Sequence, residues 1–258
     1  MGGWKVKDIA RFSSTPLAKQ RVNEATVMFR VVEGVCLSRG ALMRISEEPP
    51  AFPLHHLALL CVHGFSEDDV LRIVAAHRRY EETQAFRRLS GKWRDILEKD
   101  MYHLAQYVSI VSGDGIDPAL IVGVVEEESR RGRFLGSCFY FPSQKVESPL
   151  RSIPGEAEAF KKIVAGINST RNPRYRMPVS YPAVSCPGET GFGGAMGFVQ
   201  MLPSVWLAYE PEIREVMGKK EFVDPYSLIA ALHGIAMYLR DNASFFHTLP
   251  RDVSVSDS

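Results

Sequence analysis

The chain has 258 residues, of which 45% are hydrophobic and 24% are charged, as in an ordinary globular protein. Its 31 Lys and Arg residues nearly balance 30 Asp and Glu residues, so no basic surplus points to a nucleic-acid partner. The longest apolar runs, such as Leu57–Val62, are far shorter than the roughly 20 residues that span a bilayer, so no transmembrane segment is expected.

The first quarter of the chain predicts little regular structure. Residues 1–65 predict irregular helix and loop, with one candidate helix at Glu24–Val35. A firmer helix is predicted from Ser66, which can cap the helix while Asp69 completes a capping box three residues later. Apolar residues then recur at helical spacing, which predicts a buried face made of Val70, Ile73, Val74, His77 and Tyr80.

Five further helices are predicted downstream. The first carries an apolar stripe at spacings of three and four, made of Trp93, Leu97, Met101, Leu104, Val108 and Val111. The second opens at Asp117-Pro118, an N-cap followed by a proline at the first helical position, and runs through Glu128. The other three are predicted at 156–167, at about 203–217 and from Asp224-Pro225 to about Asn242. Residues 136–155 and 172–194 predict loops, and the second is long enough to be functional.

The end of the helix at residues 117–129 is the most informative stretch. At 100° per residue, Glu128 shares a face with apolar residues that must be buried, namely Ile121, Val124 and Val125. Burial raises the pKa of a carboxyl, so that a Glu can stay protonated near neutral pH and donate a proton to a leaving oxygen. The alternative is that Glu128 lies in water at a frayed helix end or pairs with one of the arginines that follow it.

Three short motifs follow one another along the chain. Residues 128–132 read ESRRG, and residues 193–206 read GGAMGFVQMLPSVW. Asp224-Pro225 then precedes a predicted helix that contains Tyr238-Leu239. In this order they resemble the E-[ST]-x-x-G, G-A-M-G-x-x-Q-F-[MI]-P-S-[ST] and D-P-x-D-A…Y-[LF] motifs of the membrane-bound lytic transglycosylase B-like family, within the lysozyme superfamily. The resemblance covers roughly residues 95–242.

The resemblance implies a mainly α fold with a lysozyme-like catalytic domain at 95–258 and a helical N-terminal annex of unknown role at 1–94. The family cleaves the glycosidic bond between N-acetylmuramic acid and N-acetylglucosamine of peptidoglycan with a single Glu, which implies Glu128 here. That Glu protonates the glycosidic oxygen and then removes the proton of the muramic acid C6 hydroxyl, which attacks the anomeric carbon and gives a 1,6-anhydro sugar. Substrate contacts are implied for Ser129, Gly194, Ala195, Met196, Gln200 and Tyr238.

The second motif is also chemically suited to a sugar cleft. Its glycines can let the backbone pass close to a polymer, and Gln200, expected at the start of a helix, can offer an amide to sugar hydroxyls. Glu126 and Glu127 are expected to be solvated.

The cysteines and histidines give further expectations. Cys36 and Cys61 are expected to be buried free thiols, because unpaired cysteine packs like a small hydrophobe. The resemblance places Cys138 and Cys186 beside the cleft, where a disulfide could join them. The histidines lack zinc spacing and the acidic calcium loop of some relatives is absent, so neither a metal nor a cofactor is expected. The helical His77 and His233 are expected to be packed structural residues.

The family's location implies an extracytoplasmic protein in the periplasm or cell wall, although no secretory signal is visible at the N-terminus. Peptidoglycan strands are the expected partner. Two alternatives stay open: a hydrolytic muramidase of goose-lysozyme type, in which water replaces the C6 hydroxyl, and a non-catalytic peptidoglycan-binding protein. The second alternative rests on a cleft-closing C-terminal helix of the relatives that the chain is not expected to contain.

Overall fold

The structure, a computed structural model, describes residues 36–47, 52–81, 96–141, 155–169, 171, 173, 176–180, 183–187 and 193–243. These residues form α-helices and, apart from isolated bridges, no β-structure, which confirms the mainly α class. The predicted helix at Glu24–Val35, Trp93 and the boundary predicted at residue 94 lie outside the described residues. No helix in the described ranges is long and apolar enough to cross a membrane.

Two helices that the sequence did not predict open the described chain, α3 (Arg39–Glu47) and α4 (Leu54–Val62). α4 is apolar on nearly all sides, so it lacks the periodic pattern by which an amphipathic helix is recognised. Cys61 at its end forms a disulfide with Cys36, with 5.4 Å between the Cα atoms. The expectation of free thiols at these two positions was therefore wrong, because the fold brings together cysteines that are 25 residues apart.

The helix predicted from Ser66 is α5 (Glu67–Glu81). Its capping box is confirmed: the Ser66 amide donates to Asp69 Oδ2 at 3.3 Å, and the Asp69 amide donates to Ser66 Oγ at 3.2 Å. The predicted apolar face is also confirmed, since each of its members is buried: Val70, Ile73, Val74, His77 and Tyr80.

α5 packs on α7 (Glu98–Val111) through polar as well as apolar contacts. The buried carboxylate of Asp100 pairs with Arg79 and accepts a hydrogen bond from the Tyr80 hydroxyl at 3.2 Å. Side chains before and after residue 94 contribute to one hydrophobic cluster that extends from Leu37 to Leu239. The N-terminal helices therefore share a core with the rest of the molecule.

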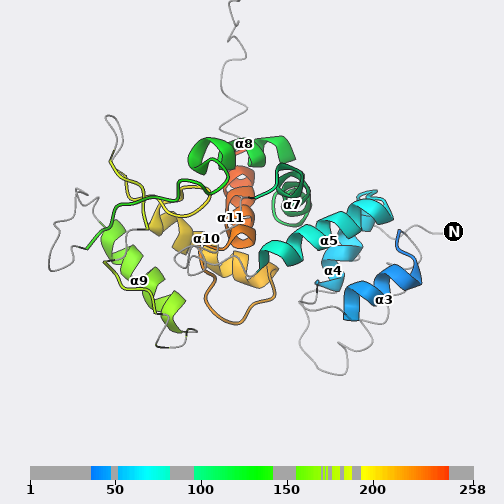
Figure 1. Ribbon diagram of the computed structural model, residues 1–258, viewed down its shortest axis with the longest axis horizontal. Coiled ribbons are helices and arrows are strands. Elements are labelled where there is room, and N and C mark those ends of the chain that lie inside the picture. The colour runs from blue at the N-terminus through cyan, green and yellow to red at the C-terminus, as the bar shows by residue number, and fades with distance from the viewer. Residues whose placement is uncertain are drawn as a thin grey trace, which may run out of the picture.

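The remaining helices are α8 (Pro118–Ser129), α9 (Glu156–Ser169), α10 (Pro203–Val216) and α11 (Leu228–Asp241). Figure 1 shows α11 at the centre, with α8 across one end, α9 on one side and α3–α5 on the other. Every residue of α11 from Leu228 to Met237 is buried. Gly234 leaves room for Trp206 of α10, because an added Cβ there would lie 3.1 Å from the indole ring. α11 is thus the helix around which the others pack.

Two predicted helix starts compare differently with the structure. Asp117 caps α8 as predicted, since its carboxylate accepts from the Ala119 amide at 2.9 Å. The start predicted at Asp224-Pro225 was wrong by three residues, because α11 has Ser227 as its N-cap and begins at Leu228. Asp224 instead closes a turn, in which its carboxylate accepts from the Tyr226 amide and its carbonyl accepts from the Ser227 amide.

Candidate functional site

Glu128 lies in the last turn of α8, where the chain reverses direction. Arg130, Arg131 and Gly132 follow with φ values of 46°, 57° and 85°, so three consecutive residues adopt left-handed backbone. The Arg130 and Arg131 amides donate to the carbonyls of Glu126 and Val125 and so close the helix end. The helix end is therefore built and hydrogen-bonded rather than frayed, and it fixes the backbone from which Glu128 projects.

The prediction that Glu128 ends the buried stripe was wrong. The buried residues of α8 are Ile121, Val125 and Ser129, which follow one another at intervals of four. Val124 is half-buried and Glu128 is exposed, so the stripe passes beside Glu128 rather than through it. A helical wheel fixes which residues share a face, but the neighbouring helices decide how much of that face they cover.

The electrostatic surroundings of Glu128 nevertheless favour its protonated form. Partial burial raises the pKa of Glu128, and the negative charge of Glu127 raises it further. Among the residues that the structure describes, none forms a hydrogen bond or an ion pair with Glu128. Arg131 pairs instead with Glu126 at 2.9 Å and approaches Glu98 at 3.7 Å. The carboxyl is thus accessible, unpaired within the described chain and biased toward holding a proton.

The Ser129 hydroxyl is engaged in hydrogen bonds within the fold. Its side chain is 1% exposed, donates to the Val125 carbonyl at 3.0 Å and accepts from the Gly132 amide at 3.0 Å. The residue predicted to contact substrate therefore holds the reversal that follows α8.

A set of paired segments links the end of α8 to the glycine-rich motif. Cys138 pairs with Val184, Val184 with Met196, and Met196 with Met201, each in an antiparallel bridge. In Figure 1 these segments lie to the side of α8, toward α9. The predicted disulfide between Cys138 and Cys186 is present, with 5.0 Å between the Cα atoms. The segment that follows the first motif is thus linked through residues 184–186 to the second motif, by backbone pairing and by a disulfide.

The glycines of the second motif make room for the protein itself. Gly194, with φ 93°, lies against the Tyr140 hydroxyl, which donates to the Gly194 carbonyl at 2.9 Å. Gly197, with φ 70°, lies so close to the Pro225 carbonyl that an added Cβ would be 2.5 Å from its oxygen. These glycines therefore let the backbone pass close to Tyr140 and to the turn before α11, which are both parts of the protein.

The backbone donors predicted to hold a sugar are already engaged. The Ala195 amide donates to Ser185 Oγ at 3.0 Å, and the Met196 amide donates to the Met201 carbonyl at 2.9 Å. The Met196 side chain is 1% exposed and belongs to the core. These two residues shape the paired segments and have no free N–H group to offer.

Gln200 does not start a helix, contrary to the prediction, because α10 begins at Pro203. It ends a turn with φ 46°, and its side-chain amide donates to the Gly197 carbonyl at 2.8 Å. The amide nitrogen therefore holds the turn. No hydrogen bond to its side-chain oxygen comes from a residue that the structure describes, so this oxygen can still accept one.

Tyr238 is exposed on α11 and its ring meets Tyr209 edge to face at 6.2 Å. Near it, the guanidinium of Arg240 donates to the Ser112 carbonyl, in the link between α7 and α8. Among the described residues, no hydrogen bond, ion pair or ring contact joins Tyr238 to Glu128.

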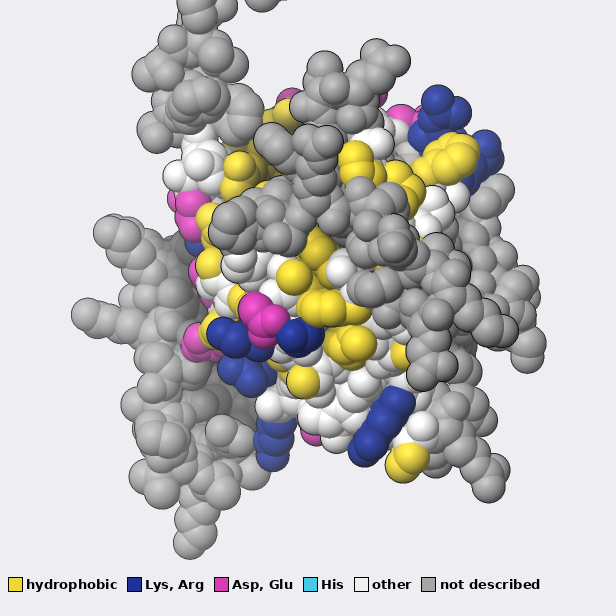
Figure 2. Space-filling view, turned by 90° about the vertical axis from the view of Figure 1, so that its left-hand side faces the viewer, with side chains coloured by type: hydrophobic (Ala, Val, Ile, Leu, Met, Phe, Trp, Pro, Cys, Tyr) yellow, Lys and Arg dark blue, Asp and Glu magenta, His cyan; other side chains and the backbone are white. Residues whose placement is uncertain are grey.

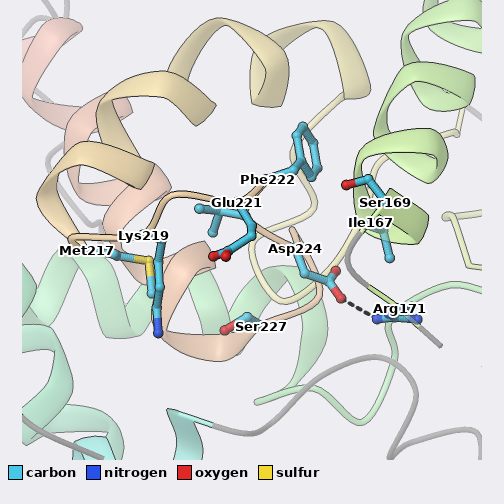
Figure 3. Close-up of a pocket in the computed structure, with 10 residues that line it drawn as sticks. Ile167, Ser169, Arg171, Met217, Lys219, Glu221, Phe222, Asp224 and Ser227 are labelled. Carbon is cyan, nitrogen blue, oxygen red and sulfur yellow. Dashed lines mark hydrogen bonds and ion pairs between the residues drawn. The ribbon is translucent and has the colours of Figure 1, made fainter.

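A cavity of about 650 Å³ is a separate feature (Figure 3). It is lined by parts of α9, the α10–α11 loop and Arg171, and includes neither Glu128 nor Gln200. Arg171 and Asp224 form an ion pair of 2.6 Å at one side of it (Figure 3). This pair was not predicted, because its members are 53 residues apart and Arg171 lies in a stretch without periodicity. Within the described residues no cluster of His, Cys, Asp and Glu could hold a metal ion.

Comparison of the chain with models of protein families, with curated proteins and with solved structures finds no match.

Proposed function

We propose that this protein is a lytic transglycosylase of lysozyme-like fold that cleaves peptidoglycan strands outside the cytoplasm, with Glu128 as its only catalytic acid and base. The observation that carries the proposal is an accessible Glu at a rigid helix end, unpaired among the described residues, whose pKa is raised by partial burial and by Glu127. The motifs around Glu128 and residues 193–206 add the resemblance in sequence.

A raised pKa supports the first step of the proposed reaction. The protonated Glu128 gives its proton to the glycosidic oxygen, and the resulting carboxylate then takes the proton of the C6 hydroxyl. Glycosidases with two carboxylates place the second one across the scissile bond from the first. Glu127 is adjacent in sequence and Glu126 is paired with Arg131, so neither neighbour is suited to that position. A mechanism with one Glu fits these surroundings.

The surface beside α8 supports a polymer partner. Figure 2 views the side of the molecule on which α9 and the paired segments lie in Figure 1, and hydrophobic side chains form a band through the middle of this face. Charged side chains of both signs lie beside the band. Exposed apolar surface with a polar rim is typical of interaction sites, and it suits the apolar faces of sugar rings.

The deciding experiment compares wild type, E128Q and E126Q on purified sacculi. E128Q removes the acid while keeping the shape of the side chain, and E126Q changes the same helix turn away from the proposed chemistry. We expect E128Q to release anhydro-muropeptides roughly 100-fold more slowly or worse, the usual effect of losing a general acid, and E126Q to stay near wild type. Equal release by wild type and E128Q would remove Glu128 from the reaction.

One observation favours the non-catalytic alternative. The Ser129 hydroxyl and the amides of Ala195 and Met196 are engaged within the fold, so fewer groups than expected are available to position a sugar for reaction. A binding protein would sediment with sacculi, release no product and bind as well with E128Q as without it. The same assay separates the hydrolytic muramidase, whose product is heavier than the anhydro sugar by one water molecule.

A further inference from the structure

An exposed aromatic ring lies beside the chain reversal that follows Glu128. Phe134 is 60% exposed, more than any other large hydrophobic side chain in the described ranges, of which the next, Leu97, is 47% exposed. A ring that stays in water contributes little to folding, because the hydrophobic gain comes from surface that is removed from water. The apolar surface of Phe134 is therefore available to a ligand.

Hydrogen bonds hold the backbone of Phe134 against the last turn of α8. The Phe134 amide donates to the carbonyl of Ser129, the residue after Glu128, at 3.0 Å. The Gly132 amide donates to Ser129 Oγ, also at 3.0 Å, and so ties the reversal to the same residue. The position from which the ring projects is thus fixed relative to the turn that carries Glu128.

A cation accompanies the ring. The guanidinium carbon of Arg130 lies over the Phe134 ring, 5.3 Å from its centroid. Arg130 is exposed, and no hydrogen bond or ion pair joins its guanidinium to another residue in the described part of the chain. Arg131, by contrast, is bound to Glu126 at 2.9 Å. A guanidinium has five N–H donors, and contact with a ring face leaves them able to bind a carboxylate in two parallel hydrogen bonds.

We propose that Phe134 and Arg130 form a subsite for an anionic glycan strand, in which the ring packs on the apolar face of a sugar and the guanidinium binds a carboxylate of the strand. Peptidoglycan supplies both groups, because its sugars have apolar C–H faces and its muramic acid carries a carboxyl that is free or joined to an acidic peptide. A neutral glycan would match the ring but leave the charge of Arg130 unanswered. This inference rests on the proposed function, since it adds a substrate contact two residues after Glu128.

The test is an NMR titration of the full chain carrying E128Q, so that strands stay intact, with three soluble ligands. These are short peptidoglycan strands with their peptides, the same strands after an amidase has removed the peptides, and the neutral tetramer of N-acetylglucosamine. We expect F134A to weaken the binding of all three about three- to tenfold, because it removes apolar contact with the sugar. R130M should weaken the binding of anionic strands about two- to fivefold and leave the neutral tetramer unchanged. A loss with peptide-bearing strands assigns the bound carboxylate to the peptide, and a loss with bare strands assigns it to muramic acid.

Further variants in the same E128Q chain separate the subsite from general effects. F134Y keeps the ring and should bind all three ligands as the parent chain does. M43A and R44M change adjacent exposed residues of α3, which Figure 1 shows apart from α8, and should also bind as the parent does. If none of the three ligands binds, the proposed function and this inference both fail. If the ligands bind but F134A or R130M behaves like the α3 controls, or if R130M weakens the neutral tetramer as much as the strands, this inference alone is overturned.

Discussion

At the scale of single residues, Glu128 is an exposed carboxyl whose pKa is nevertheless raised. The side chain is accessible, yet its pKa is raised, because partial burial penalises the carboxylate and Glu127 adds a like charge while no described cation pairs with it. Of the two arginines that follow, Arg131 is held by Glu126, and the guanidinium of Arg130 lies over the Phe134 ring. The arrangement leaves an accessible carboxyl whose pKa is raised.

The contribution of Glu127 can be measured directly. We expect E127Q to lower the pKa of Glu128, because it removes the like charge, and to move the alkaline limb of any activity to lower pH, since the reaction starts from the protonated acid. The measurement is a carbon-13 NMR titration of the Glu128 carboxyl. E215Q, at an exposed glutamate of α10, is the control and should leave that titration nearly unchanged. Identical titrations of wild type and E127Q would contradict the electrostatic account.

At the scale of elements, local patterns and tertiary packing account for different helices. The caps at Ser66 and Asp117 and the apolar face of α5 follow from local rules and were predicted. α4 was missed because it is apolar on most sides, and the start of α11 was misplaced because Asp224 is held by Arg171 and closes a turn. Local sequence therefore predicted the amphipathic helices best.

Two helical glycines offer a test of packing against helix propensity. Gly123 in α8 has open space where a Cβ would lie, so G123A should raise the free energy of unfolding by about 0.5–1 kcal/mol. In α9, a Cβ on Gly166 would lie 2.5 Å from the Phe222 ring, so G166A should lower it by roughly 1–3 kcal/mol despite the better propensity of Ala. Urea unfolding measures both. Equal stabilisation by the two substitutions would show that Phe222 moves aside freely.

At the scale of the whole molecule, a buried aromatic cluster holds the N-terminal helices to the central ones. His56 of α4, His77 of α5, Tyr107 of α7 and His233 of α11 meet with ring centroids 5.3–5.6 Å apart. The Tyr107 hydroxyl lies 2.7 Å from His56 Nδ1, and the Ser112 hydroxyl lies 2.6 Å from His233 Nδ1. His77 and His233 are thus packed residues, as predicted, and they belong to one cluster with His56.

This cluster makes stability depend on pH. Burial lowers the pKa of His56 well below 6.5 and that of His233 to about 3. The unfolded chain therefore binds more protons than the folded chain below pH 6.5, so stability is full above that pH and falls as pH decreases toward the folded pKa values.

H233N should remove one such titration while keeping a hydrogen-bonding partner for Ser112. Between roughly pH 6 and pH 4, the slope of unfolding free energy against pH should decrease by about 1.4 kcal/mol per pH unit relative to wild type. Chemical unfolding at several pH values gives the slope. H103N, at a histidine of α7 outside the cluster, is the control, and a slope for H233N equal to that of wild type would exclude His233 as a source of the acid sensitivity.

Residue spacing and contacts between near neighbours were enough to predict the mainly α class, most helix positions and the placement of Glu128 in the last turn of a capped helix. The exposure of Glu128, the contacts of Gly194 with Tyr140 and of Gly197 with Pro225, and the pairing of Arg171 with Asp224 became known from the folded chain alone. So did the bond between Cys36 and Cys61. Burial and pairing between distant residues depend on how helices pack, and no local pattern encodes which residues will meet.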